Sequence, residues 1–337
     1  MADKLKDDLQ IVIHHKAEDK YYIPAVVESA RWETSWKGAP GRFTFTILKD
    51  EIIQVAEGDV VQANYQGTNF FYGFVFSKKR DKNMQITITA YDQLRYLKNK
   101  SIYVFTEKTA SEMITAIAKD FMLKTGSIAD TAYVIPKYRG SNQCVLDIIQ
   151  DLLDMTTENC TDESGNKVLK LYVLYDDFGE LTLKELDEMQ TNILIDNETA
   201  QNFAYESTID KETYNKVVLV YDDKEKGVTE AARAADPENI AQWGMLQLTE
   251  TVNPKKPMNY QVMADNKLAY YNRVRRSLSI KGAFGSIKVR AGSMVVTDLN
   301  LGDVKLTKEM IVDSVSHSFS NCEHTMDLVL KGDVITG

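Results

Sequence analysis

Cysteine and histidine are scarce in this chain, and no long stretch of it is continuously apolar. Among 337 residues there are four histidines and three cysteines, which lie far apart at Cys144, Cys160 and Cys322. An odd number of cysteines at such spacing argues against a disulfide framework and fits a reducing compartment. Because no apolar run reaches about eighteen residues, we expect no membrane-spanning helix.

The N-terminal segment also lacks the features of an export signal. It reads Met-Ala-Asp-Lys-Leu-Lys-Asp-Asp and contains no apolar stretch, so we expect the chain to fold in a cytoplasm. The formal net charge is −9, and a chain with this overall field is not drawn to a nucleic-acid backbone. The densest basic cluster, Arg273-Val274-Arg275-Arg276, is interpreted as a solvated helix end.

Patterns for phosphate and metal binding are missing. The segment Gly282-Ala283-Phe284-Gly285 has neither the lysine nor the spacing of a phosphate loop, and its glycines predict a sharp turn from helix to strand. His317, Cys322 and His324 do not have the spacing of a zinc finger, so they are interpreted as residues around a turn at Asn321. We therefore predict that no cofactor and no metal is bound.

Two remaining candidates for catalysis have simpler structural interpretations. Cys144 precedes an amphipathic helix and is interpreted as part of its core, because no local signature of a nucleophile accompanies it. Asp176 and Asp177 are interpreted as the polar tip of a hairpin, because no distant carboxylate stands out as their partner. The sequence therefore predicts a protein that is not an enzyme.

The most informative feature is a strand pattern that occurs once near each end of the chain. In the first half, Gly58-Asp59-Val60 is followed by strand patterns at residues 71–76 and 85–90. In the second half, Gly302-Asp303-Val304 is followed by strand patterns at residues 310–315 and 325–330. Two related β-units would give one subunit two equivalent ways to dock, so three such chains in a ring would present six similar faces.

Local patterns divide the chain into three parts. Residues 1–100 contain short alternating strands at roughly ten-residue spacing, which is typical of a sandwich or barrel. Residues 101–195 mix helices and strands and are predicted to be an α+β insertion. Residues 196–337 return to strands, with inserted helices expected at 236–244 and 260–276.

The helices of the middle part have clear sequence patterns. Thr109-Ala110-Ser111-Glu112 predicts a capping box, and the helix that follows is expected to end at Gly126. A second helix is predicted from Ser141, because apolar residues recur at helical spacing from Val145 onward. Strand patterns on both sides of Asp176-Asp177-Phe178-Gly179 predict a hairpin.

At this point the motifs indicate a family. Residues 73–98, which include GFVF and ITITAYDQLRYLK, resemble the tail proteins of contractile phages. More specifically, they resemble the baseplate hub proteins of defective Bacillus prophage particles, which are relatives of late control protein D. The stretch GAFGSIKVRAGSM at 282–294 and the strands at 310–330 strengthen this resemblance, which covers nearly the whole chain.

The motif residues that carry the resemblance are structural, mainly glycines at turns and residues at strand ends. They are Gly58, Asp59, Gly73, Tyr91, Asp92, Leu94, Gly282, Gly285, Arg290, Gly292, Gly302 and Asp303. The implied fold is α+β and mostly β, with two tube-protein-like β-barrels, an α+β insertion between them and helices near the second barrel. The barrels would occupy residues 1–100 and 196–337.

The resemblance also implies a function and a set of partners. Family members form a trimeric ring that joins the sixfold tail tube to the threefold central spike. This implies a homotrimer that contacts the tail tube protein, the central spike protein and the baseplate wedge proteins. It would contact no membrane and no specific nucleic acid. The expected location is the baseplate of a virion or phage-tail-like bacteriocin particle, assembled in the host cytoplasm.

Two alternatives stay open on the sequence alone. A tail-associated enzyme of cell-wall degradation would place its active site in the middle part, where Asp176 and Asp177 form the acid pair and histidine is absent. A carbohydrate-binding tail-tip protein would have an exposed groove lined by aromatic residues.

Overall fold

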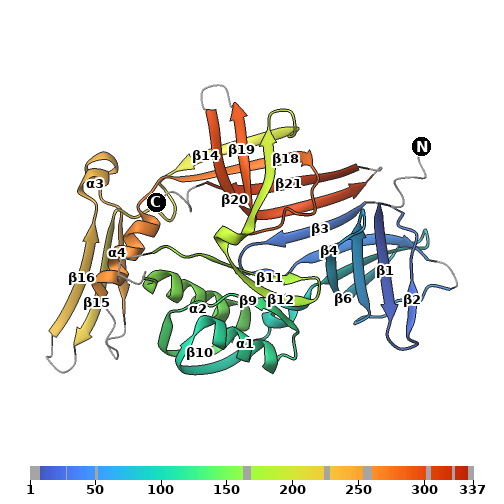
Figure 1. The fold of residues 1–337 in the computed structure, drawn as a ribbon, viewed down its shortest axis with the longest axis horizontal. Coiled ribbons are helices and arrows are strands. Elements are labelled where there is room, and N and C mark those ends of the chain that lie inside the picture. The colour runs from blue at the N-terminus through green and yellow to red at the C-terminus, as the bar shows by residue number, and fades with distance from the viewer. Residues whose placement is uncertain are drawn as a thin grey trace.

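Strands dominate the computed structural model, in agreement with the predicted mostly-β, α+β class (Figure 1). The structure describes residues 8–27, 29–49, 52–161, 168–223, 228–252, 260–300, 305–320 and 323–332. Thirteen of the strands in these ranges belong to one large sheet, and the others form three small sheets. No helix in the described ranges has both the length and the apolar character needed to cross a bilayer.

The first β-unit forms from the alternating sequences near the N-terminus. Phe43, Phe45 and Ile47 alternate along one face of the second strand in its hairpin and are completely buried, as expected for a half-buried strand. The strands of this unit are β1 (Leu9–His15), β2 (Lys20–Tyr22), β3 (Ala30–Ser35), β4 (Arg42–Leu48), β5 (Val60–Tyr65), β6 (Thr68–Arg80) and β7 (Gln85–Tyr91).

The second β-unit forms from the last third of the chain and one segment before it. Leu278, Ile280, Leu328 and Leu330 provide the buried face at its centre. Its strands are β13 (Gln190–Asp196), β14 (Asn202–Thr208), β18 (Arg275–Phe284), β19 (Met294–Asn300), β20 (Lys305–Ser320) and β21 (Glu323–Lys331).

Five strands of each unit are hydrogen-bonded in the same spatial order. The order is β3-β4-β7-β6-β5 in the first unit and β14-β18-β21-β20-β19 in the second. If the five strands of each unit are numbered by their order along the chain, both units therefore have the spatial order 1-2-5-4-3. The units differ at the sixth strand, because β1 pairs antiparallel with β5 whereas β13 pairs parallel with β19.

The equivalence of the units extends to single hydrogen bonds. Gly58 has φ +87° and donates its N–H to the Val75 carbonyl at 2.7 Å, and Gly292 has φ +85° and donates to the Val312 carbonyl at 2.8 Å. In both units the register of the next strand pair shifts directly after this valine. Gly292-Ser293-Met294 is thus the structural counterpart of Gly58-Asp59-Val60.

This match changes the repeat predicted from the sequence. The strand patterns at 85–90 and 325–330 do correspond, because Ala90 pairs with Val75 as Leu330 pairs with Val312. Gly302 and Asp303 lie outside the described residues, between β19 and β20. Gly58-Asp59 precede the third of the five matched strands in the first unit, whereas Gly302-Asp303 precede the fourth in the second unit. The shared Gly-Asp-Val sequences therefore do not mark equivalent places.

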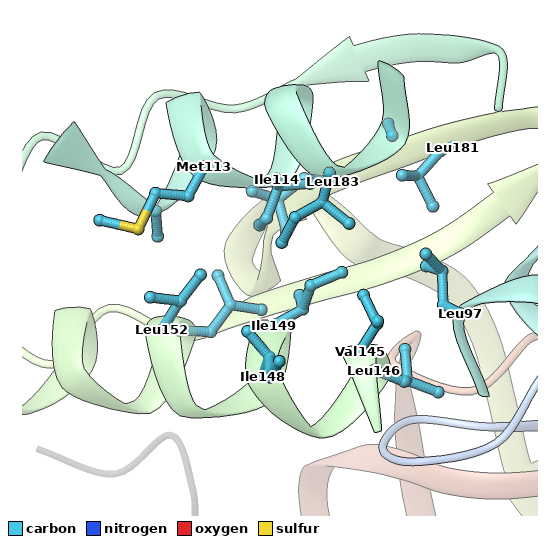
Figure 2. Close-up of a cluster of buried hydrophobic side chains, with 14 of the residues drawn as sticks. Leu97, Met113, Ile114, Val145, Leu146, Ile148, Ile149, Leu152, Leu181 and Leu183 are labelled. Atoms are coloured by element: carbon cyan, nitrogen blue, oxygen red, sulfur yellow. The ribbon is translucent and has the colours of Figure 1, made fainter. Parts of the chain in front are cut away.

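The middle region separates the two units along the chain and has its own apolar core (Figure 2). Two helices pack there against a small sheet, with Met113, Ile114, Ile148, Leu181 and Leu183 among the completely buried side chains. The elements are η1 (Gln93–Lys98), β8 (Lys100–Thr109), α1 (Ala110–Asp120), β9 (Thr125–Ile128), β10 (Val134–Cys144), α2 (Val145–Asn159), β11 (Tyr172–Asp177), β12 (Glu180–Glu185) and η2 (Leu186–Met189).

Most predictions for the middle region are confirmed, with errors at helix ends. The capping box of Thr109 and Glu112 is present, and the hairpin of β11 and β12 forms as predicted. Helix α1 ends at Asp120 and not at Gly126, which lies in β9. Helix α2 begins at Val145 because Ser141 belongs to β10, where it pairs with β8.

A second insertion, here called the arm, separates β14 from β18. It consists of a three-stranded sheet and two helices, and it projects to the left of Figure 1. Buried Lys267 of the arm forms an ion pair with Glu158 of α2, which holds the arm against the middle region, and a second ion pair with Glu250 within the arm. The elements are β15 (Lys216–Asp223), β16 (Val228–Ala235), α3 (Pro237–Trp243), β17 (Gln247–Thr251) and α4 (Tyr260–Tyr271).

Two predictions for the arm and the following strand are wrong. Helix α4 ends at Tyr271 and not at residue 276, so Arg275 and Arg276 belong to β18 and do not form a helix end. Gly282 also lies within β18, at a shift of register, and not in a turn from helix to strand. The helix at Asp236 is confirmed, with Gly244 as its C-cap.

The matched glycines give a test of the duplicated geometry. Gly58→Ala should lower the free energy of unfolding by about 1–2 kcal/mol, because its left-handed φ brings Cβ against the following carbonyl oxygen. Gly292→Ala has the same φ but would also overlap the Val173 side chain, so it should cost more. Urea unfolding of both variants measures the difference, and Val173→Ala should recover part of the excess. Equal losses for the two variants would contradict this account.

Candidate functional site: the joint between the β-units

The two β-units are joined edge to edge by a strand pair. The second half of β20, residues 314–319, pairs antiparallel with β3, residues 30–35. The Trp36 N–H donates to the Asp313 carbonyl at 2.8 Å and extends the pairing by one residue. As a result, backbone hydrogen bonds run without interruption from one unit into the other. Figure 1 shows β3 and β20 side by side at this joint.

Aromatic rings cover one face of the joint. Trp32 of β3 stacks on His317 of β20 with ring centroids 4.7 Å apart, and Phe70 stacks on Phe319 at 5.3 Å. His324 stacks on Phe319 from the neighbouring strand at 4.3 Å. These rings belong to both units, so their burial depends on the units staying together.

The two histidines of the joint are neutral and form a directed hydrogen-bond chain. Burial lowers the pKa of His317 to about 3 and that of His324 to about 4. His317 Nε2 lies 3.0 Å from the Val289 carbonyl, which can only accept, so Nε2 carries the proton. His317 Nδ1 then accepts from His324 Nε2 at 2.9 Å. The pair is thus part of the packing of the joint.

A buried charged cluster lies where the first unit, the middle region and the second unit meet. Arg290 of the second unit lies with its guanidinium 3.9 Å from the ring centre of Tyr175 and donates to the Asp176 carbonyl at 2.9 Å. Asp92, which follows β7, accepts from the backbone N–H groups of Gly41 and Leu94 at 2.8 and 3.0 Å. The cluster thus ties together three parts of the chain.

Burial dominates the electrostatics of this cluster. It raises the pKa of Asp92 well above its ordinary value, and the nearby Asp176 charge raises it further. Burial also raises the pKa of Asp176 to about 6, against the opposing effects of the Gly179 N–H and the Arg290 charge. The pKa of Arg290 is lowered by burial. Two carboxyl groups and one guanidinium therefore share a site with little water.

The motif residues predicted from the sequence lie at several places. Asp92 and Arg290 are brought together in the charged cluster. Tyr91 lies beside Gly73, where a side chain would overlap the Tyr91 carbonyl, so glycine permits close approach of β6 and β7. Leu94 packs separately, in the core of the middle region.

The remaining motif residues shape loops and strand ends. Asp59 accepts from His15 and from the Ala56 N–H, which fixes the approach to β5. Gly285 donates its N–H to the His324 carbonyl, and a side chain there would overlap the histidine ring. The Gly282 N–H donates to Asp327. None of these contacts brings a nucleophile and a base together.

The sequence analysis assigned no role to Trp32 and interpreted His317 and Asp176 only as parts of turns, but the structure places all three at the centre. Trp32 and His317 come from opposite halves of the chain, and only the pairing of β3 with β20 brings them together. Asp176 was interpreted as part of a polar hairpin tip, but it is only 5% exposed. Side chains alternate between the two faces of a strand, so Asp176 lies on the same face of β11 as Tyr172, which is buried. This alternation could have indicated that Asp176 is buried. Among the described residues no group of three potential ligands could hold a metal ion.

Comparison with known proteins identifies the fold and then the family. The structure matches the 43 kDa tail protein of prophage MuSo2 from Shewanella oneidensis with a TM-score of 0.70 and 12% identity, over 96% of this chain and 98% of that chain. The chain therefore has the fold of a phage tail protein. The model of the YQBQ-like family matches residues 30–331, and the chain belongs to this family.

One sequence relative and one further solved structure are also similar to this chain. The protein XkdQ of the phage-like element PBSX from Bacillus subtilis strain 168 is 31% identical over 330 residues, which are 95% of this chain and 97% of XkdQ. A type VI secretion component of Escherichia coli, described as structurally similar to the T4 tail proteins gp27 and gp5, matches with a TM-score of 0.54 and 8% identity. That match covers 91% of this chain and 73% of the other. The predicted resemblance to prophage tail proteins is confirmed.

The raised pKa of Asp176 predicts a pH dependence of stability. The fold favours the protonated carboxyl, so this group's contribution is complete below pH 4 and is lost as pH rises through about 6. Relative to Asp176→Asn, the wild-type free energy of unfolding should fall by up to about 3 kcal/mol between pH 4 and 6.5. Chemical denaturation across this range measures the fall, with exposed Asp210→Asn as the control. If the difference in unfolding free energy between the wild type and Asp176→Asn did not change with pH, the raised pKa of Asp176 would be refuted.

Proposed function

We propose that this chain is a structural baseplate hub of a contractile tail, in a phage or a phage-tail-like bacteriocin. Three copies would form a ring between the sixfold tail tube and the threefold central spike. The observation that carries the proposal is the matched strand order of the two β-units together with their edge-to-edge joint. A chain with two equivalent units provides six of them in a trimer, which fits a sixfold partner.

The unduplicated parts support the threefold side of the proposal. The middle region and the arm occur once per chain, so a trimer would present each of them three times. A threefold spike needs contacts that repeat three times, and a sixfold tube needs contacts that repeat six times. One chain therefore contains the elements for both symmetries. Baseplate wedge proteins would be further neighbours, in a particle assembled in the host cytoplasm.

The domain division follows the same scheme. The division predicted from the sequence, at 1–100, 101–195 and 196–337, needs two shifts of boundary, because η1 packs in the core of the middle region and β13 pairs within the second unit. We therefore propose a first tube-like unit up to residue 91, an insertion at 92–189 and a second tube-like unit from residue 190. The separate apolar cores of the first unit, middle region and second unit support these divisions. The similarity described for the Escherichia coli protein to the T4 tail proteins gp27 and gp5 supports a role of this fold in a tail.

The burial of Asp176 argues against a cell-wall-degrading enzyme that uses Asp176 and Asp177 as its acid pair. Asp176 is only 5% exposed whereas Asp177 is exposed. Because neighbouring residues of a strand point to opposite faces, the two carboxyl groups could not flank one glycan bond. A general acid must lie within hydrogen-bond reach of the bond that it protonates. The raised pKa of Asp176 has a sufficient cause in burial alone. The proposed role is therefore structural and not catalytic.

Assembly with the tube protein tests the hub. The purified chain should form trimers in sedimentation velocity experiments and should bind the tail tube protein encoded beside it, with two tube subunits per hub chain. This ratio follows from the two β-units in each chain. A control in which the tube protein is replaced by an unrelated ring protein should show no binding. A chain that stays monomeric at high concentration with tube protein present would contradict the proposal.

A further inference from the structure

Two of the strand edges in the described part of the chain are left without a partner. Strand β14 lies at the end of the large sheet and pairs only with β18. Strand β6 pairs with β5 up to Phe74, and beyond that residue its Ser77–Arg80 segment pairs only with β7. Glu206 and Ser207 of β14 and Lys79 of β6 are exposed. Unpaired edges of this kind are templates for another strand.

These two edges are the counterparts of the strands that form the joint. Strand β14 holds the place in the second unit that β3 holds in the first, and β6 holds the place of β20. Tyr205 corresponds to Trp32, because each pairs with the equivalent buried residue of the next strand. Ser77 corresponds to Ser314, because each follows the matching shift of register. Within one chain the joint is therefore made once, and both elements for a second joint remain.

We propose that β6 of a second copy pairs antiparallel with β14, in the register of the internal joint. This inference rests on the proposed function, because it supplies the contact that would close three chains into a ring. The same rotation that relates the two units of one chain would then relate the second unit to the next chain. Such a head-to-tail contact closes into a ring when the rotation permits. When the register of the internal joint is applied to β6 and β14, the facing residues are Ser77 and Thr208, Lys79 and Glu206, and Arg80 and Tyr205.

The side chains at the transferred pairs are complementary. Lys79 and Glu206 carry opposite charges and correspond to Ser316 and Glu33 of the internal joint. In an antiparallel strand pair, hydrogen-bonded and non-hydrogen-bonded residue pairs alternate. Because Trp36 and Asp313 form a hydrogen-bonded pair, Glu33 and Ser316 form a non-hydrogen-bonded one, and so would Lys79 and Glu206. Side chains are closest in pairs of this kind. Arg80 would lie over the ring of Tyr205, as His317 lies over Trp32, and would form a cation–π contact.

A hydrogen bond to a hydroxyl group at the internal joint also has a counterpart at the proposed contact between copies. The Ala291 N–H donates to Thr34 Oγ1 at 2.9 Å, which fixes the loop before β19 on β3. The equivalent residues are Glu57, which directly precedes Gly58, and Ser207 of β14. Ser207 therefore provides a hydroxyl at the position where the joint uses that of Thr34. Its exposure leaves this hydroxyl accessible to the Glu57 N–H of another copy.

The alternation of the strand pair also gives a selective way to block the edge. The N–H groups of Trp32, Thr34 and Trp36 face β20, so their counterparts in β14, including Ser207, face away from β18. Proline at Ser207 would remove an outward N–H and leave the pairing with β18 intact. Ser207→Thr keeps both the N–H and the hydroxyl and is the matched control.

The experiment measures assembly of the full-length chain by sedimentation velocity over a range of concentrations. Lys79→Glu and Glu206→Lys should each raise the concentration needed for half-assembly at least about 10-fold, because like charges then face each other. The double variant, with the charges exchanged, should return most of this loss. Ser207→Pro should stay monomeric, and at concentrations where the wild type is also monomeric the two thermal unfolding curves should match. Ser207→Thr and the exposed Lys137→Glu should assemble like the wild type.

The outcomes separate this inference from the hub itself. A wild-type trimer that Ser207→Pro and the single charge reversals leave unchanged would overturn the β6–β14 contact and leave the hub standing. If the charge exchange failed to restore what either reversal had removed, the proposed register would be wrong. A wild-type chain that stayed monomeric even with tube protein would contradict the hub, and the inter-copy contact with it.

Discussion

An unpaired strand edge is the constraint on which this structure depends. Backbone donors and acceptors at the rim of a sheet must find a partner or remain in water, and a long open edge invites uncontrolled pairing. Here each unit has the same strand order, so each has an open edge on its first strand. The chain pairs one of these edges internally through β20 and β3. The tryptophan, histidine and phenylalanine rings of the joint then become a common core for both units.

Parts that are not duplicated are attached where they do not interrupt this sheet. The middle region follows β7, and the charged cluster of Arg290, Asp92 and Asp176 fixes it to both units. The arm extends the connection between β14 and β18 and contacts the middle region through Lys267. The repeated sheet and the single insertions thus have separate attachments. In the proposed hub, a chain built in this way would combine two symmetries without distorting its strands.

The sequence predicted the parts whose causes are local. Alternation located most strands, the capping box located α1, and the strand patterns at 85–90 and 325–330 proved equivalent in register. The shared letters of Gly58-Asp59-Val60 and residues 302–304 misled, because the true counterpart Gly292-Ser293-Met294 keeps only the left-handed glycine. What is preserved there is a backbone conformation, and a serine can accept the local hydrogen bond as well as an aspartate does.

The candidate site was harder to predict because it is made of distant contacts. Asp92 and Arg290 were recognised as motif residues, but nothing in their local sequence indicates that they meet beside Tyr175. Trp32 and His317 are separated by most of the chain, and β-sheet register brings them into contact. A helix end or hairpin depends on neighbouring residues, whereas a joint between sheets depends on two edges at once.

The separation between β3 and β20 along the chain has a consequence for synthesis. The ribosome completes the first unit long before it produces the strand that covers its edge, and contacts of such sequence separation form slowly. During this interval the nascent chain carries an open β-edge and a hydrophobic core that still lacks Phe319 of β20, a condition that favours misassembly. Strand β20 therefore covers this edge late, and truncation before residue 314 would leave the β3 edge unpaired and Trp32 and Phe70 without the rings that pack on them. An unpaired edge beside exposed aromatic rings favours aggregation.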